Sequence, residues 1–223
     1  MGKQLFIGLA VEGNTDSRFL KSVVSRTFID LVFRKSEQSV DIEVFCVKTS
    51  KVGKTFREFV ADASKDGVEQ FGVLIMAVHA DSDKDTITER MNDKFIPAQK
   101  YLDSLKGDNY CRVITPIIPI KMIEAWMMAD TVLLKDEIGT TLTDVDLGLH
   151  RSPETVADPK ALIENAIRLS QLSVSKKRRN LSINDLYGIM GDEISLESLS
   201  RLPSYIAFRD AAENSLREIH YIP

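Results

Sequence analysis

The stretch LFIGLAVEGNTD, which runs from Leu5 to Asp16, decides the fold class of this chain. Its first seven residues are apolar or glycine, a pattern that is typical of a strand buried on both faces. The run ends at an acid, Glu12, and a second acid, Asp16, follows four residues later. Apolar residues then recur at helical spacing from Phe19 to Val32, so the stretch predicts the junction of a buried strand and a helix.

Strand-length apolar runs and segments of helical period alternate through the first half of the chain. Continuous apolar strands separated by helices predict a parallel sheet that is covered on both faces. Pro116 and Pro119 confine the last strand to an edge or mark its end, because proline cannot donate a ladder hydrogen bond. Strands are expected at residues 5–11, 41–47, 72–80 and 112–118, with helices after a cap at Asn14 or Thr15 and through residues 56–63. After them only helices are expected, over residues 122–134, 158–172, 182–190 and 204–219.

Length and composition favour one core. The chain has 223 residues and is 43% hydrophobic, so we expect an α/β domain over residues 1–120 and a helical region over residues 121–223 that packs on the same core. No apolar run approaches the roughly 18 to 20 residues that cross a bilayer, and Met1 does not begin a signal peptide. We therefore expect a cytoplasmic protein with no membrane association. The net charge of −4 argues against a globally basic protein, so nucleic acid would have to bind a local basic patch.

Acids also follow the strand expected at residues 72–80, where HADSDKD places Asp81 and Asp83 at alternate positions. The carboxyl ends of neighbouring parallel strands meet at one edge of a sheet, so Glu12 and Asp16 are expected to converge with these aspartates. Four carboxylates at one place repel one another, so unless some of them hold protons they need a compensating cation. Oxygen ligands without His or Cys favour Mg²⁺ or Mn²⁺, and these ions promote phosphoryl transfer.

At these residues the sequence resembles the TOPRIM superfamily, the catalytic domain shared by type IA and type II topoisomerases, bacterial primases, small ribonucleases and the overcoming-lysogenisation-defect nucleases. The matching motifs are a glutamate that ends the first strand, here in VEGNTD, and an Asp-x-Asp that ends the third strand, here DSD. The spacing of Glu12 and Asp16 is most similar to the overcoming-lysogenisation-defect nucleases, which implies that both acids bind metal. Lys84 follows the aspartates where many members of the superfamily have glycine, so the chain departs from the polymerase and topoisomerase pattern.

Two later segments, IPIKMIEAWMMAD and ADPKALIE, resemble a smaller family of uncharacterised TOPRIM-like prokaryotic proteins. Members of that family are often encoded beside ATPases in operons of the phage-defence type. This resemblance covers most of the chain and implies a partner ATPase and a role in antiviral defence.

Other protein classes also place acids after strands. Asp16 alone fits an acid in the first turn of a helix, where the helix dipole stabilises it. A calcium-binding loop starting at Asp81 is not expected, since Thr86 stands where glycine is required and Asn92 where glutamate is required. Haloacid-dehalogenase phosphatases carry Asp-x-Asp on the first strand, where this chain has Glu12. Receiver domains lack the helical C-terminal third that we expect here.

Glu124 is a further candidate metal ligand. On the helix expected at residues 122–134 it lies at the border of the apolar stripe that contains Trp126. It is therefore either a ligand that leans into the metal site or an ordinary acid at the edge of a helix. Trp126 and His79 are expected in the core.

The basic run Lys176, Lys177, Arg178 and Arg179 lies between two expected helices and is the candidate nucleic-acid contact. Adjacent cations on a loop suit phosphate groups, and Lys177 would stabilise the charge that develops on a scissile phosphate. The alternative is a solvated loop without a ligand.

Together these features predict a divalent-metal-dependent nuclease that hydrolyses phosphodiester bonds, with DNA favoured over RNA. Glu12, Asp16, Asp81 and Asp83 would hold Mg²⁺ or Mn²⁺, and Glu12 is alternatively the general base for the attacking water. Two alternatives belong to other classes. One is a non-catalytic TOPRIM module that assembles with a partner ATPase, and the other is a phosphohydrolase or nucleotidyl-transfer enzyme that acts on small substrates.

Overall fold

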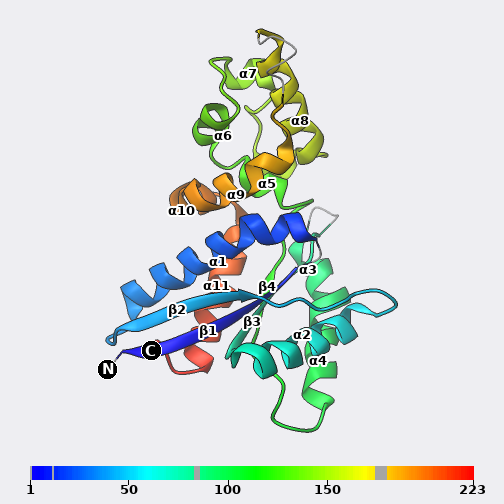
Figure 1. Cartoon of the computed structure of the whole chain (residues 1–223), viewed down its shortest axis with the longest axis vertical. Coiled ribbons are helices and arrows are strands. Elements are labelled where there is room, and N and C mark those ends of the chain that lie inside the picture. Colours follow the sequence, from blue (N-terminus) through cyan, green and yellow to red (C-terminus); the bar gives the residue numbers. More distant parts are fainter. Residues whose placement is uncertain (1, 12, 83–85, 174–179) are drawn as a thin grey trace.

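Four parallel strands form one sheet in the part of the chain that this computed structural model describes, namely residues 2–11, 13–82, 86–173 and 180–223 (Figure 1). The strands are β1 (Lys3–Ala10), β2 (Val40–Cys46), β3 (Ile75–His79) and β4 (Ile114–Ile117), in the order β2-β1-β3-β4. Each neighbouring pair is parallel. The predicted α/β class with a parallel sheet is thus confirmed, and β4 lies at an edge as its proline predicts.

Helices make up the rest of the regular structure and fall into two groups (Figure 1). One group covers the sheet, and the other extends from it along the long axis of the molecule. The first comprises α1 (Asn14–Lys35), α2 (Phe56–Phe71), α3 (Ile87–Arg90), the π-helical turn η1 (Met91–Phe95), α4 (Ile96–Ser104) and α11 (Pro203–Glu218). The second comprises α5 (Glu124–Met127), α6 (Thr131–Glu137), α7 (Asp144–Leu147), η2 (Pro153–Thr155), α8 (Pro159–Ser170), η3 (Gln171–Ser173), α9 (Ile183–Glu193) and α10 (Leu196–Leu199).

The two faces of the sheet bury separate apolar clusters, because side chains along a strand alternate between the faces. Ile7 and Leu9 of β1 belong to the cluster that includes α1 and α11. Met76 and Val78 of β3 belong to the cluster that includes α2 and α4. This layering explains why the strands read as almost continuous apolar runs in the sequence.

Two sequence expectations about helices were wrong, and the sequence predictions also missed a helical segment. The helix expected over residues 122–134 is two helices, because the side chain of Asp130 accepts a hydrogen bond from the backbone N–H of Leu133 (3.2 Å) and starts α6 anew. The first helix is capped at Gly13 rather than at Asn14 or Thr15. The helical segment from α3 through η1 to α4 was not expected, and its π-helical turn interrupts the ordinary helical period.

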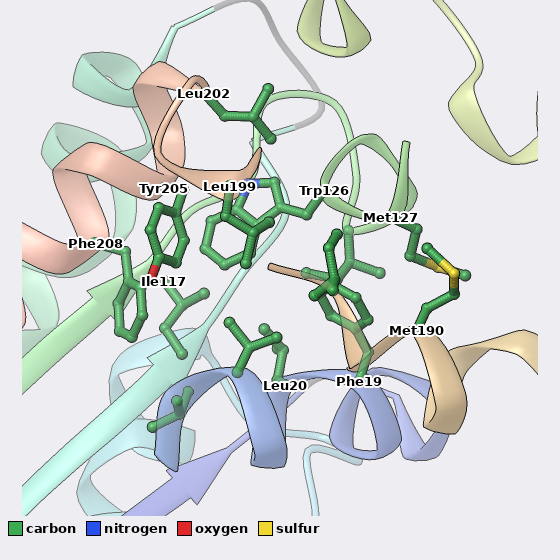
Figure 2. Close-up of a cluster of buried hydrophobic side chains, with 14 of the residues drawn as sticks. Phe19, Leu20, Ile117, Trp126, Met127, Met190, Leu199, Leu202, Tyr205 and Phe208 are labelled. Carbon is green, nitrogen blue, oxygen red and sulfur yellow. The ribbon is translucent and has the colours of Figure 1, made fainter. Parts of the chain in front are cut away.

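A cluster of buried side chains connects the sheet to the helical group (Figure 2). Phe19 and Leu20 of α1 lie in one cluster with Trp126 of α5 and Met190 of α9. The ring of Tyr205 in α11 packs edge-on against Trp126, with centroids 5.4 Å apart. The apolar cluster therefore includes residues on both sides of residue 120, while the boundary itself stays a prediction.

Close packing of α9 on α1 yields a stability prediction at Gly191. A Cβ at this position would lie 2.6 Å from the carbonyl oxygen of Phe19 and 2.7 Å from its Cα. Gly191→Ala should therefore lower the free energy of unfolding by about 1–3 kcal/mol. Gly188, on the same helix, has nothing within 4 Å of such a Cβ. Gly188→Ala should raise stability by about 0.5–1 kcal/mol through helix propensity. Urea denaturation of both variants checks the pair, and equal effects would contradict the packing.

Candidate metal centre

Asp16 and Asp81 reach the same edge of the sheet from neighbouring strands. The chain leaves β1, turns at Gly13 and starts α1, so Asp16 stands in the first helical turn and its carboxylate accepts a hydrogen bond from the Gly13 N–H (3.0 Å). Asp81 follows the last residue of β3 by two positions. The connection from β2 to β3 crosses β1, so β1 and β3 flank the point where the strand order reverses. Open parallel sheets bind ligands at this point.

His79 joins the two carboxylates. Its side chain is fully buried, with Nε2 lying 3.1 Å from Oδ1 of Asp81 and Nδ1 lying 3.6 Å from Oδ2 of Asp16. The side chains of Asp16 and Asp81 keep 16% and 29% of their surface exposed, so the pair can be reached from solvent. The expected convergence of these two acids is therefore present in the structure, whereas their role as metal ligands stays a prediction.

Glu124 lies near this pair, in contact with Tyr187. It begins α5 and is buried rather than at a helix edge, and the Tyr187 hydroxyl of α9 donates a hydrogen bond to its Oε1. Burial raises the pKa of Glu124, and the negative charge of Asp81 adds to the effect. Burial also raises the pKa of Tyr187, as do Glu124, Asp16 and Asp81. Three of the predicted ligands thus influence one tyrosine, which the sequence did not single out.

A buried polar network holds α5, and with it Glu124, in place. The indole Nε1 of Trp126 donates a hydrogen bond to Oγ of Ser204 (2.6 Å), whose hydroxyl in turn donates to Oε1 of Glu154. The backbone N–H of Ser204 also donates to Glu154 Oε1 (3.1 Å). Trp126 is fully buried, as expected, and its hydrogen bond adds a fixed orientation to its packing.

We expect Glu154, which is buried in this network, to make the free energy of unfolding depend on pH. Burial raises its pKa from the ordinary value of 4.5. Because the folded protein then binds this proton more tightly than the unfolded chain, the free energy of unfolding falls as pH rises from the unfolded through the folded pKa. Glu154→Gln removes this titration and should gain stability relative to wild type across that range. Urea denaturation at several pH values measures the difference, and a difference that does not vary with pH would contradict the prediction.

The segments that follow β3 and β4 are tied together beside Asp81. The Ser82 N–H donates to the carbonyl of Pro119 (3.0 Å), and the Lys121 N–H donates to Oγ of Ser82 (3.0 Å). Arg90 donates to the carbonyl of Ser82 (2.7 Å). Lys121 has a φ of 66°, in the left-handed region that residues other than glycine seldom adopt. Such strained positions cluster at functional sites, and these bonds restrict the backbone next to Asp81.

The remaining predicted site residues are not placed. Glu12, Asp83, Lys176, Lys177, Arg178 and Arg179 lie outside the described residues, so the predictions about them stand as made from the sequence. Among the described residues, no group of three or more His, Cys, Asp or Glu side chains is arranged to hold a metal ion. The carboxylate oxygens of Asp16 and Asp81 are nevertheless the donor type that Mg²⁺ and Mn²⁺ prefer, and Glu12 and Asp83 would complete the set.

A groove next to Asp16 carries positively charged side chains rather than carboxylates. A cavity of about 420 Å³ at the ends of β1 and β2 is lined by Gly13 and Ser17 at the start of α1, by the segment from Lys48 to Lys51, and by Leu9, Val11, Cys46 and Val47. Lys48 is exposed, and the ammonium of Lys51 lies 5.0 Å from the ring centre of Phe59. Ammonium and hydroxyl groups suit phosphate. An apolar cavity of about 410 Å³ lies over β4, and the Ile and Phe side chains in its lining do not suit phosphate.

Comparisons with protein-family models, with curated proteins and with solved structures each gave no match. The resemblance to the TOPRIM superfamily therefore stays a prediction from the sequence motifs. No helix in the described ranges combines the length and the apolar character needed to cross a membrane.

Proposed function

We propose that this protein is a Mg²⁺- or Mn²⁺-dependent nuclease, active in the cytoplasm, whose metal site is built at the carboxyl edge of β1 and β3. The observation that carries the proposal is the position of Asp16 and Asp81, which share one buried imidazole at the point where the strand order reverses. Carboxylates from separate elements, gathered where a parallel sheet receives ligands, fit a metal centre better than two independent surface acids.

In this proposal Asp16 and Asp81 hold the ion together with Glu12 and Asp83, and Glu124 is a further ligand or a neighbour that orients them. A bound divalent ion supplies Lewis-acid activation of the phosphate and a more acidic water. Glu12 is a ligand or the general base for the attacking water. Lys177 stabilises charge on the scissile phosphate, and the run from Lys176 to Arg179 binds the nucleic-acid backbone.

The groove from Lys48 to Lys51 favours a polymeric substrate over a small one. It starts at Gly13 and Ser17, next to Asp16, and continues towards the end of β2. A chain whose scissile phosphate lies at Asp16 and Asp81 would place a neighbouring phosphate in this groove. DNA stays the preferred substrate, and a partner ATPase and a role in phage defence stay proposals that rest on the sequence resemblance.

A cleavage assay with plasmid DNA and structured RNA tests the proposal. We expect cleavage in Mn²⁺ or Mg²⁺ and none in chelator. Hydrolysis of nucleotides without cleavage of either polymer would favour the enzyme that acts on small substrates. Metal binding without any hydrolysis would favour the non-catalytic module that assembles with an ATPase.

The salt dependence of binding tests the groove. Lys48→Gln combined with Lys51→Gln should weaken binding alike across sequences and reduce the slope of log affinity against log salt by at most about 0.9 for each phosphate of duplex DNA that the variant no longer neutralises. Lys106→Gln is the matched control, since this exposed lysine lies in the connection before β4 and does not line the groove. The same measurement applies to a variant that replaces Lys176 to Arg179. An unchanged slope would mean that the replaced cationic side chains do not contact phosphates and are simply exposed to solvent.

A further inference from the structure

We infer that His79 is a positioning residue that fixes Asp16 and Asp81 as a pair for metal binding. The inference rests on the proposed function, because it assigns the geometry of the same metal site to a side chain that is not itself one of the predicted ligands.

The position of His79 follows from the alternation of side chains along β3. Ile75 and Ala77 belong to the cluster on the α1 side of the sheet, and His79 is the next residue of that series. Its ring therefore points towards the layer in which α1 begins. Asp16 stands in the first turn of α1, and its carboxylate meets Nδ1 of the ring at 3.6 Å. The second nitrogen, Nε2, meets Asp81 at 3.1 Å.

Complete burial gives His79 the rigidity that a positioning residue needs. Its side chain has no exposed surface, whereas the two carboxylates are partly exposed. Nε2 lies within hydrogen-bond distance of Asp81, whereas Nδ1 contacts Asp16 at 3.6 Å, beyond hydrogen-bond distance, so the ring is fixed most directly to Asp81 and packs against Asp16. The contacts involve one oxygen of each carboxylate, Oδ2 of Asp16 and Oδ1 of Asp81. We expect the other oxygen of each carboxylate to bind the ion.

Asp16 and Asp81 belong to different elements, so a side chain that contacts both of them, such as His79, can fix the position of one carboxylate relative to the other. Asp16 moves with α1, and Asp81 moves with the segment after β3. Replacing a side chain that contacts and orients a metal ligand, without binding the metal itself, typically lowers metal affinity by about 10- to 100-fold. His79→Leu removes both contacts at similar volume, so it should weaken Mn²⁺ binding by about that factor.

Two conservative variants separate the contacts. The side-chain amide of His79→Asn lies near the position of Nδ1 and keeps a polar group beside Asp16, and that of His79→Gln lies near the position of Nε2 and can donate a hydrogen bond to Asp81. Each should bind Mn²⁺ more tightly than His79→Leu and more weakly than wild type. Val78→Ala is the matched control, because Val78 is buried next in the chain but faces the other cluster. It should lower stability and leave Mn²⁺ affinity unchanged.

Titration of the purified protein with Mn²⁺, followed by the electron paramagnetic resonance signal of the free ion, gives the affinities without any substrate. Affinity in His79→Leu within about twofold of wild type would overturn the inference while leaving the metal site intact. Equal weakening in Val78→Ala would overturn it as well, because general loosening would then explain the weaker binding. If His79→Leu does not fold, wild-type affinity in both His79→Asn and His79→Gln would overturn it. Absence of Mn²⁺ binding in wild type would instead reject the proposed metal site and the inference with it.

Discussion

Asp81→Asn is expected to reduce metal-dependent cleavage of nucleic acid by roughly 100-fold or more, because it removes a charged oxygen ligand at the proposed centre. Its amide oxygen can still accept a hydrogen bond from His79, so the fold should persist. Glu12→Gln is expected to have an effect of the same kind. Initial rates of plasmid cleavage in Mn²⁺, measured on variants with wild-type circular dichroism, give the result.

Asp158→Asn is the matched control for this decrease. Asp158 caps α8 through a hydrogen bond from the Ala161 N–H (2.9 Å), and asparagine caps helices equally well. The control should cleave at the wild-type rate. Cleavage by Asp81→Asn at the rate of the control would remove Asp81 from the mechanism.

The second large effect concerns stability in the presence of metal. An ion that binds only the folded protein should raise the free energy of unfolding by about 2.7 kcal/mol at a free concentration of one hundred times its dissociation constant. In chelator, Asp16 and Asp81 lie against the same His79 ring in the folded state but are apart in the unfolded chain, so their mutual repulsion acts on the folded state. Asp81→Asn relieves that repulsion and should melt somewhat higher than wild type in chelator.

Melting curves of wild type and Asp81→Asn, each in chelator and in Mn²⁺, separate a metal ligand from an ordinary structural acid. Wild type should gain stability with Mn²⁺, and Asp81→Asn should respond much less. Replacement of a structural acid would lower stability under both conditions. A wild-type protein that shows no shift over a full Mn²⁺ titration would make the non-catalytic module the better account.

The sheet was predictable because a strand that is buried on both faces appears in the sequence as a nearly continuous apolar run. The runs over residues 5–11 and 72–80 have few polar interruptions, so their strands and their shared edge could be derived without a structure. The helical segment over residues 87–104 shows no comparably clear pattern of apolar residues in the sequence. Its polar residues 88–90 and 92–94 and its π-helical turn obscure the ordinary helical period.

The site was only partly predictable, since its contacts depend on how distant elements pack. The order of strands placed Asp16 and Asp81 at one edge, but the ring of His79 between them depends on the angle at which α1 leaves Gly13. Glu124 and Tyr187 lie 63 positions apart in the chain, and only the packing of α5 and α9 brings them together. Spacing in the sequence carries no signal for such a pair.

The most direct test of the central claim is anomalous diffraction from crystals of the protein soaked in Mn²⁺. The account predicts an anomalous peak at the carboxyl edge of β1 and β3, with oxygens of Asp16 and Asp81 at roughly 2.1 Å, typical of this class of ion. It also predicts that His79 contacts the other oxygen of each carboxylate. A protein that cleaves nucleic acid while its Mn²⁺ peak lies elsewhere, or that shows no peak at saturating Mn²⁺, would contradict the account.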